Sequence, residues 1–227
     1  MAVVASVACV VAAVACTRTS DGVPTAGGGA LSSTLRPTPQ PGLAPPAGGP
    51  DDQPAPGVVP TTGAPAAPGS LCAPAVLPPV RTVAQVSDPS APTATVAVPD
   101  GWSMSGGSGD VGAVLEGPSG MRATVSITAT GDEPAAAFRR YADQLTAGKV
   151  MTTLSILPGP MCGLSGQTLL GVLSDGRDTV QYQDRVVHVP APAGDYLIAV
   201  HVTAPADAPG FDDPAAVLTE DFEIGLP

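Results

Sequence analysis

Aromatic and basic residues are scarce in this sequence. Among 227 residues there are one tryptophan, three tyrosines and three phenylalanines, and the nine basic residues include a single lysine, Lys149, against twenty acidic residues. The resulting net charge of −11 excludes a cationic surface of the kind that displaces counterions from nucleic acid or docks on anionic lipid. We therefore expect neither a nucleic-acid partner nor electrostatic binding to a membrane.

Signatures of catalysis and metal binding are missing as well. The sequence contains no G-x-S-x-G motif, no C-x-x-C pair and no EF-hand spacing. Residues 107–112 match G-x-G-x-x-G in letters, but a strand pattern follows where a nucleotide site needs a helix, so we predict a flexible loop. The acidic residues between 212 and 223 are interpreted as a solvated helix end. We expect a protein that is not an enzyme, with no catalytic residue, cofactor or metal.

Only two histidines are available for acid–base chemistry. If residues 190–194 close a simple hairpin, His188 lies opposite Tyr196 and His201 lies opposite Gln183. Those two pairs fall on opposite faces of the sheet, so the histidines would not share a site. A one-residue bulge would reverse this prediction.

The segment from residue 17 to residue 71 lacks Phe, Trp, Tyr, Ile, Met and Lys, and is rich in Pro, Gly and Ala. Such a segment cannot bury enough apolar surface to offset the entropy of ordering it. We therefore predict a disordered Pro/Gly-rich tether over residues 16–71 and a single globular domain over residues 72–227. That domain holds seven basic and seventeen acidic residues, a net charge of −10.

The N-terminal sixteen residues carry no charge and end at Cys16. They are shorter than the ~20 apolar residues of a spanning helix, but they suit the apolar region of a signal peptide. Small residues before Cys16 resemble a bacterial lipobox, which implies cleavage after residue 15 and lipidation of Cys16. The alternative is an ordinary secretory signal cut after Ala13-Val14-Ala15. The first reading predicts an extracytoplasmic protein anchored to the outer face of the cell membrane, and the second predicts a secreted protein.

Four cysteines are present, and Cys9 and Cys16 belong to the signal segment. Cys72 and Cys162 remain for the domain. In an exported protein such a pair is typical of a disulfide, which here would close a loop of about 90 residues; a free buried thiol is the alternative.

Hydrophobic periodicity in the domain predicts an α+β fold, with a mainly antiparallel sheet covered by helices. A helix is expected over 135–147, because Phe138, Tyr141, Ala142 and Leu145 fall on one face, with Asp132 as its N-cap. A short second helix is expected from Asp213. Strands are expected over 94–98, 111–116, 122–130, 150–157, 167–173, 179–189 and 195–203.

Several of these stretches resemble actinobacterial lipoproteins of the LpqN/LpqT kind. The resemblance rests on Val98-Pro99-Asp100-Gly101-Trp102, the helix from Pro134 to Leu145, the strands around Val186 and Tyr196, and the closing segment 213–224. It covers most of residues 93–226 and shows scaffold positions only. It implies a PsbP-like α/β/α sandwich, a fold usually found in binding and assembly proteins.

These features together predict an exported envelope lipoprotein whose domain binds a protein or lipid component of the envelope. The loops near Trp102 and 105–110, or a cleft between sheet and helix, are the expected contact surface. Two alternatives stay open. An envelope hydrolase would bring a Ser, a His and an acid together in a pocket, and a lipid carrier would need an enclosed apolar cavity.

Overall fold

The computed structural model describes residues 55–60, 68–74, 76 and 79–227. The predicted signal peptide, the lipidation of Cys16 and most of the predicted tether lie outside these residues. Neither helix of the described part has the length and apolar character that a membrane span needs.

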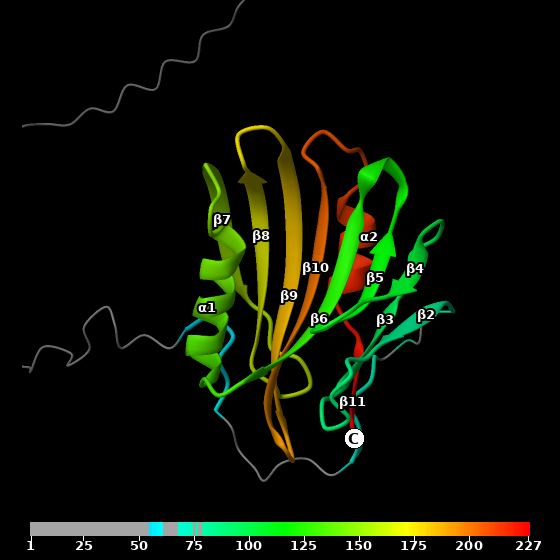
Figure 1. The fold of residues 1–227 in the computed structure, drawn as a ribbon, viewed down its shortest axis with the longest axis vertical. Coiled ribbons are helices and arrows are strands. Elements are labelled where there is room, and N and C mark those ends of the chain that lie inside the picture. Colours follow the sequence, from blue (N-terminus) through cyan, green and yellow to red (C-terminus); the bar gives the residue numbers. More distant parts are fainter. Residues whose placement is uncertain (1–54, 61–67, 75, 77–78) are drawn as a thin grey trace, which may run out of the picture. The chain divides into compact units, whose positions relative to one another are not determined.

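A seven-stranded antiparallel sheet forms the centre of the domain, with strand order β4-β5-β6-β10-β9-β8-β7 (Figure 1). Neighbouring strands in this sheet are antiparallel, and most neighbouring pairs are connected by a hairpin turn. Their bounds are β4 Ser103–Gly106, β5 Val111–Glu116, β6 Arg122–Thr130, β10 Gly194–Pro205, β9 Thr179–Ala191, β8 Gly166–Ser174 and β7 Met151–Pro158.

A second, four-stranded sheet has the order β1-β11-β3-β2. Of its strands only β3 was predicted, because the other three span four residues each and are too short to show a periodic pattern. Their bounds are β1 Gly69–Cys72, β11 Glu223–Leu226, β3 Thr93–Ala97 and β2 Arg81–Ala84.

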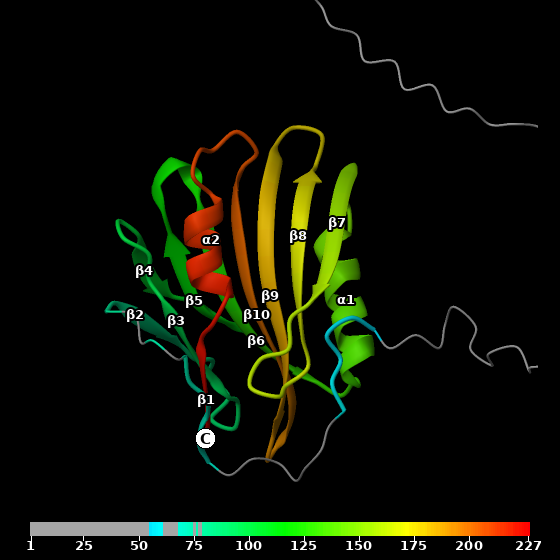
Figure 2. The same cartoon turned by 180° about the vertical axis from the view of Figure 1, so that it is seen from behind.

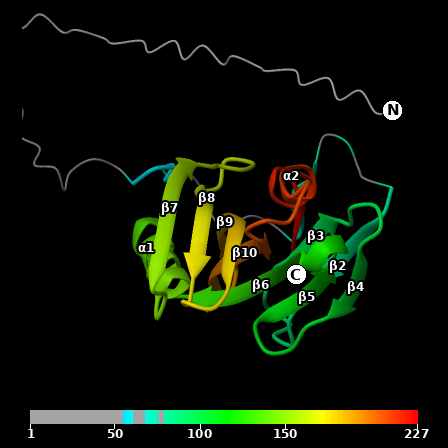
Figure 3. The same cartoon turned by 90° about the horizontal axis from the view of Figure 1, so that it is seen from above.

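The helices α1 (Pro134–Thr146) and α2 (Asp212–Thr219) lie on opposite faces of the large sheet, as Figures 1, 2 and 3 show. Helix α1 covers β8 and β9, whereas α2 covers β9 and β10 beside the small sheet. The predicted α+β class is therefore confirmed. The predicted N-cap is wrong: Glu133 precedes α1 without a side-chain cap, and the Asp132 carboxylate instead pairs with Arg140, Oδ2 to Nη2 at 2.7 Å.

Two apolar cores follow from this layering. The larger core lies between the central sheet and the layer of α2 with the small sheet, where Leu115, Ile127, Ile198 and Phe222 are all buried. The smaller core lies under α1 and consists of Phe138, Ala142, Leu169, Leu173, Tyr182, Val186 and Ala199. Phe138 and Ala142 occupy the helix face that the periodicity predicted.

The domain begins earlier than the predicted boundary at residue 72. The Gly166 N–H donates to the Gly57 carbonyl at 2.9 Å, and Gln167 Nε2 donates to the Pro56 carbonyl at 2.8 Å. The Val59 N–H donates to Ser165 Oγ at 3.0 Å, and Val58 packs against the core under α1. Residues 55–60 and β1 are thus parts of the folded domain, although their composition predicted a tether.

Cys72 and Cys162 form the predicted disulfide, with their Cα atoms 5.6 Å apart. The bridge joins the end of β1 to the connection between β7 and β8.

Candidate binding sites

Trp102 lies in an apolar groove of about 550 Å³, between the turn that follows β3 and the start of α2. The turn is closed by the Trp102 N–H, which donates to the Pro99 carbonyl at 3.1 Å, and Gly101 adopts φ +78°. The apolar lining comes from three separate parts of the chain: Pro79, Ala97, Val98, Pro99, Trp102, Pro118, Met121, Pro209, Pro214 and Val217. The groove has the size and apolar character of a ligand site.

The charged residues of this groove are both acidic. Asp100 lies in the turn beside Trp102, and Asp213 lies in the first turn of α2, where the helix dipole favours a carboxylate. Both aspartates are solvent-exposed, which agrees with the prediction of a solvated helix end at residues 212–213. The groove therefore favours a ligand that combines apolar surface with positive charge.

The Trp102 ring rests against the backbone at Gly117. A Cβ atom built on Gly117 would lie 2.3 Å from Cε2 of the indole. No side chain larger than hydrogen fits there while the ring keeps its place.

Gly117→Ala is therefore expected to displace Trp102. Because Trp102 is the only tryptophan, its fluorescence reports on this position alone, and we expect a shifted emission maximum with a loss of stability of about 1–3 kcal/mol. Gly131→Ala is the matched control, because a Cβ at Gly131 meets no atom within 4 Å. An unchanged spectrum in the Gly117 variant would contradict the packing.

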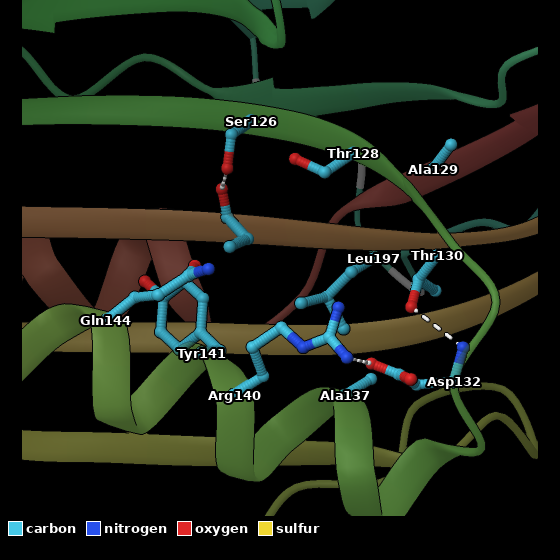
Figure 4. Close-up of a pocket in the computed structure, with 11 residues that line it drawn as sticks. Ser126, Thr128, Ala129, Thr130, Asp132, Ala137, Arg140, Tyr141, Gln144 and Leu197 are labelled. Carbon is cyan, nitrogen blue, oxygen red and sulfur yellow. Dashed lines mark hydrogen bonds and ion pairs between the residues drawn. The ribbon is translucent and has the colours of Figure 1, made fainter.

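A smaller and more polar pocket of about 220 Å³ lies between α1 and strands β6 and β10. Figure 4 shows Arg140, Tyr141 and Gln144 projecting from α1 toward the sheet. Its polar groups are largely paired with one another: Arg140 with Asp132, and Thr130 Oγ1 with the Asp132 N–H at 3.1 Å. With about two-fifths of the volume, this pocket is a weaker candidate for a ligand than the groove at Trp102.

A buried carboxylate lies next to this pocket. Asp184 of β9 is fully buried, and it accepts hydrogen bonds from the Tyr141 hydroxyl at 2.7 Å and from His201 Nδ1 at 2.6 Å. The network ties α1 to β9 and β10. Since a carboxylate oxygen only accepts, Nδ1 of His201 carries the proton of this bond, and 28% of the His201 side chain is exposed.

The predicted register of the two histidines is wrong. His201 lies opposite Asp184, and His188 lies opposite Leu197, one residue away from the pairing expected for each. Ala191 pairs with Gly194, so the hairpin closes on two residues and both histidines face α1. His188 is buried, and its Nε2–H donates to the Asp132 carbonyl at 3.0 Å.

The arrangement that a hydrolase needs is incomplete. In the part of the chain that the structure describes, neither histidine lies within hydrogen-bond distance of a serine, threonine or cysteine side chain. Ser165, which lies beside glycine in the sequence, is buried and bonded to the backbone of Val59. The His201–Asp184 pair is nevertheless an imidazole held in one orientation by a buried carboxylate, and it was not predicted from the sequence. The sequence did contain one indication of this pair. Asp184 is spaced two residues from Tyr182 and from Val186, so this carboxylate lies on the same buried face of the strand as those two side chains.

The tyrosines beside this carboxylate resist ionisation. Burial and Asp184 raise the pKa of Tyr182 to about 12, and burial with the Asp184 carboxylate raises the pKa of Tyr141 well above its usual value. The Tyr182 hydroxyl donates to the Thr153 carbonyl at 3.1 Å.

The protein is therefore expected to lose stability at high pH. The folded-state pKa of each tyrosine exceeds the unfolded value near 10, so their contribution is complete below pH 10 and falls as the pH rises toward 12. Urea unfolding at pH 9, 10 and 11 should show a progressive decrease in the free energy of unfolding. Tyr182→Phe should flatten this dependence, whereas a wild-type stability independent of pH would contradict the assignment.

No family model and no curated protein matches the chain. Among solved structures the chain is similar to one described as LpqN, involved in cell envelope biogenesis of Mycobacterium tuberculosis. The identity is 20% and the TM-score 0.49, over 64% of this chain and 91% of the other.

Proposed function

We propose that this protein is an exported, lipid-anchored component of the cell envelope whose domain binds a partner protein without catalysing a reaction. The ligand we propose is an extended, cationic peptide segment of that partner, held in the groove at Trp102. The observation that carries the proposal is an open apolar groove whose charged lining residues, Asp100 and Asp213, are both acidic.

The chemistry of the groove favours a peptide over a lipid. An acyl chain needs an enclosed apolar cavity, whereas this groove is open to solvent and carries carboxylates. Proline and valine side chains offer contact to aliphatic or proline side chains, and the face of Trp102 attracts a cation. The domain's net charge of −10 would also speed the approach of a basic partner.

Export is supported by the disulfide and by the uncharged segment that ends at Cys16. Lipidation of Cys16 would hold an acidic protein at a membrane that its charge does not attract. The resemblance to LpqN/LpqT lipoproteins in the sequence agrees with this location.

Cys16→Ala tests the anchor. In a bacterial host that lipidates such proteins, the wild type should fractionate with membranes and carry acyl mass on its N-terminal residue. The variant should lose both properties, while the matched variant Cys9→Ala keeps them. Wild-type protein that is released, with no acyl mass, would contradict lipidation and leave a secreted protein.

Titration of the full-length chain in detergent with a synthetic peptide that alternates proline, leucine and arginine tests the groove. We expect Trp102 emission to change with saturation, and a peptide with glutamate in place of arginine to bind at least about tenfold more weakly. Asp213→Asn should weaken binding of the arginine peptide. Asp143→Asn, at an exposed position of α1 away from the groove, should leave the binding unchanged. Equal binding of both peptides, or saturable binding of palmitate instead, would overturn the proposed ligand.

The alternative of a hydrolase rests on the His201–Asp184 pair. It predicts turnover of an ester substrate that is abolished by His201→Ala. The proposed binding function predicts no turnover, and the arginine peptide should bind His201→Ala as it binds the wild type.

A further inference from the structure

Strand β7 forms an edge of the large sheet that no other strand of the described residues covers. Figures 1 and 2 show it at the outer side of β8, with no described strand beyond it. All eight of its residues are exposed, including Met151 at 55%, Leu154 at 37%, Ile156 at 38% and Leu157 at 50%. No charged residue occurs from 150 to 174, and β7 contains no proline before Pro158. Proteins normally protect an edge of this length with charge, proline or a bulge.

The hydrogen bonds to β8 define which backbone groups of β7 face outward. The Gly159 N–H donates to the Gly166 carbonyl at 2.9 Å, and the register continues from Pro158 opposite Gln167 through the whole strand. In an antiparallel ladder the hydrogen-bonded residues alternate, so odd-numbered residues of β7 face β8. The backbone groups of Thr152, Leu154 and Ile156 therefore point away from the sheet.

We propose that β7 pairs with β7 of a second copy of this chain, in antiparallel register about a two-fold axis at Leu154. In this register all three outward-facing residues form hydrogen-bonded pairs with the second copy. The ladder ends before Pro158, which has no N–H to donate. A shift of the axis toward Pro158 would place that proline in the ladder, and a shift the other way would leave Ile156 without a partner in β7.

The side chains in this register match one another. On the face toward α1, Leu154 meets its own symmetry mate, and Thr152 meets Ile156 of the second copy. On the other face Met151 meets Leu157, and Thr153 meets Ser155. Each pair joins side chains of similar polarity or shape, which is the arrangement that stabilises neighbouring strands.

A second copy fits this edge better than an acidic or basic partner would, because the edge offers no charge to pair with. The described strands at the other sheet edges, β4, β1 and β2, span four residues each and cannot form a ladder of this length. Pairing would extend the sheet through both copies and close the assembly as a symmetric dimer. The dimer is independent of the groove at Trp102.

Leu154→Lys tests the dimer, because it places two positive charges face to face at the axis. Sedimentation equilibrium of the full-length chain in density-matched detergent should give a dimer for the wild type and a dissociation constant at least about tenfold higher for this variant. Val83→Lys is the matched control, since Val83 is also exposed on an edge strand, β2. A monomeric wild type, or equal effects of the two variants, would overturn the proposal.

Cysteine cross-linking tests the register and does not depend on the folding of Leu154→Lys. Directly opposed, hydrogen-bonded residues have Cα atoms about 5.5 Å apart, within disulfide reach. With Cys9 and Cys16 changed to serine, Leu154→Cys should cross-link to itself on oxidation. Thr152→Cys alone should not, but it should cross-link to Ile156→Cys when the two variants are mixed. Self-cross-linking of Thr152→Cys as efficient as that of Leu154→Cys would refute the register.

Discussion

Replacing Cys72 and Cys162 together by alanine is expected to lower the free energy of unfolding by on the order of 4 kcal/mol. The two residues are 90 apart in sequence, and the bond removes the entropy of that loop from the unfolded chain. The bond also fixes β1, a strand of four residues that pairs only with β11. Chemical denaturation monitored by far-UV circular dichroism measures the loss.

The reduced wild type is the natural comparison for this variant. Reduction should destabilise the protein as much as the double substitution does, whereas Cys9→Ala should leave the domain's stability unchanged. A double variant as stable as the oxidised wild type would mean that the bridge does not constrain the unfolded chain.

Asp184→Ala is expected to lower the free energy of unfolding by about 3–5 kcal/mol. The substitution leaves the Tyr141 hydroxyl and His201 Nδ1 without their acceptor in a site where the carboxylate is fully buried. Helix α1 also loses its polar link to β9. Urea denaturation at pH 7 measures the effect.

Two matched variants distinguish the effect of breaking the hydrogen-bond network from the effect of removing a carboxylate. Asp184→Asn keeps the shape and one acceptor for Tyr141, so it should cost clearly less than alanine. Asp143→Ala removes an exposed carboxylate from α1 and should change stability by no more than about 0.5 kcal/mol. Equal costs for Asp184→Ala and Asp143→Ala would contradict a structural role for the network.

The longer elements of the fold were predictable because their periodicity is strong. Val125 and Ile127 alternate with Thr124 and Ser126 along β6, and they are the fully buried residues of that stretch. Phe138 and Ala142 likewise identify the buried face of α1. Strands β1, β2, β4 and β11 were missed, because a strand of four residues carries no clear period.

The hairpin before β10 shows how one residue changes a functional conclusion. The prediction placed the turn at residues 190–194. In the structure Ala191 pairs with Gly194, so the turn is shorter and His201 lies opposite Asp184. A shift of one residue transfers a side chain to the other face of a strand. The buried network was therefore invisible until the register was known, although Asp184 lay in phase with apolar neighbours.

Residues 55–60 show the limit of composition as a guide to order. Pro56, Gly57 and Val59 join the domain through backbone atoms, which composition does not encode. At Gly57 a Cβ atom would lie 1.8 Å from the Gly166 carbonyl oxygen, so glycine permits this close approach. The loops near Trp102, by contrast, were predicted as part of a contact surface. Trp102 lines the larger apolar groove described here.

The most direct test of the binding function is an NMR titration of the isotopically labelled full-length chain with the arginine-containing peptide. A single tryptophan gives a single indole N–H signal, so the groove has its own reporter. We predict saturable shifts of the Trp102 indole and of the Gly117 and Val217 amides, with the amides of α1 unchanged. Shifts confined to α1 and His201, or no shift at peptide concentrations up to the millimolar range, would contradict binding in the groove at Trp102.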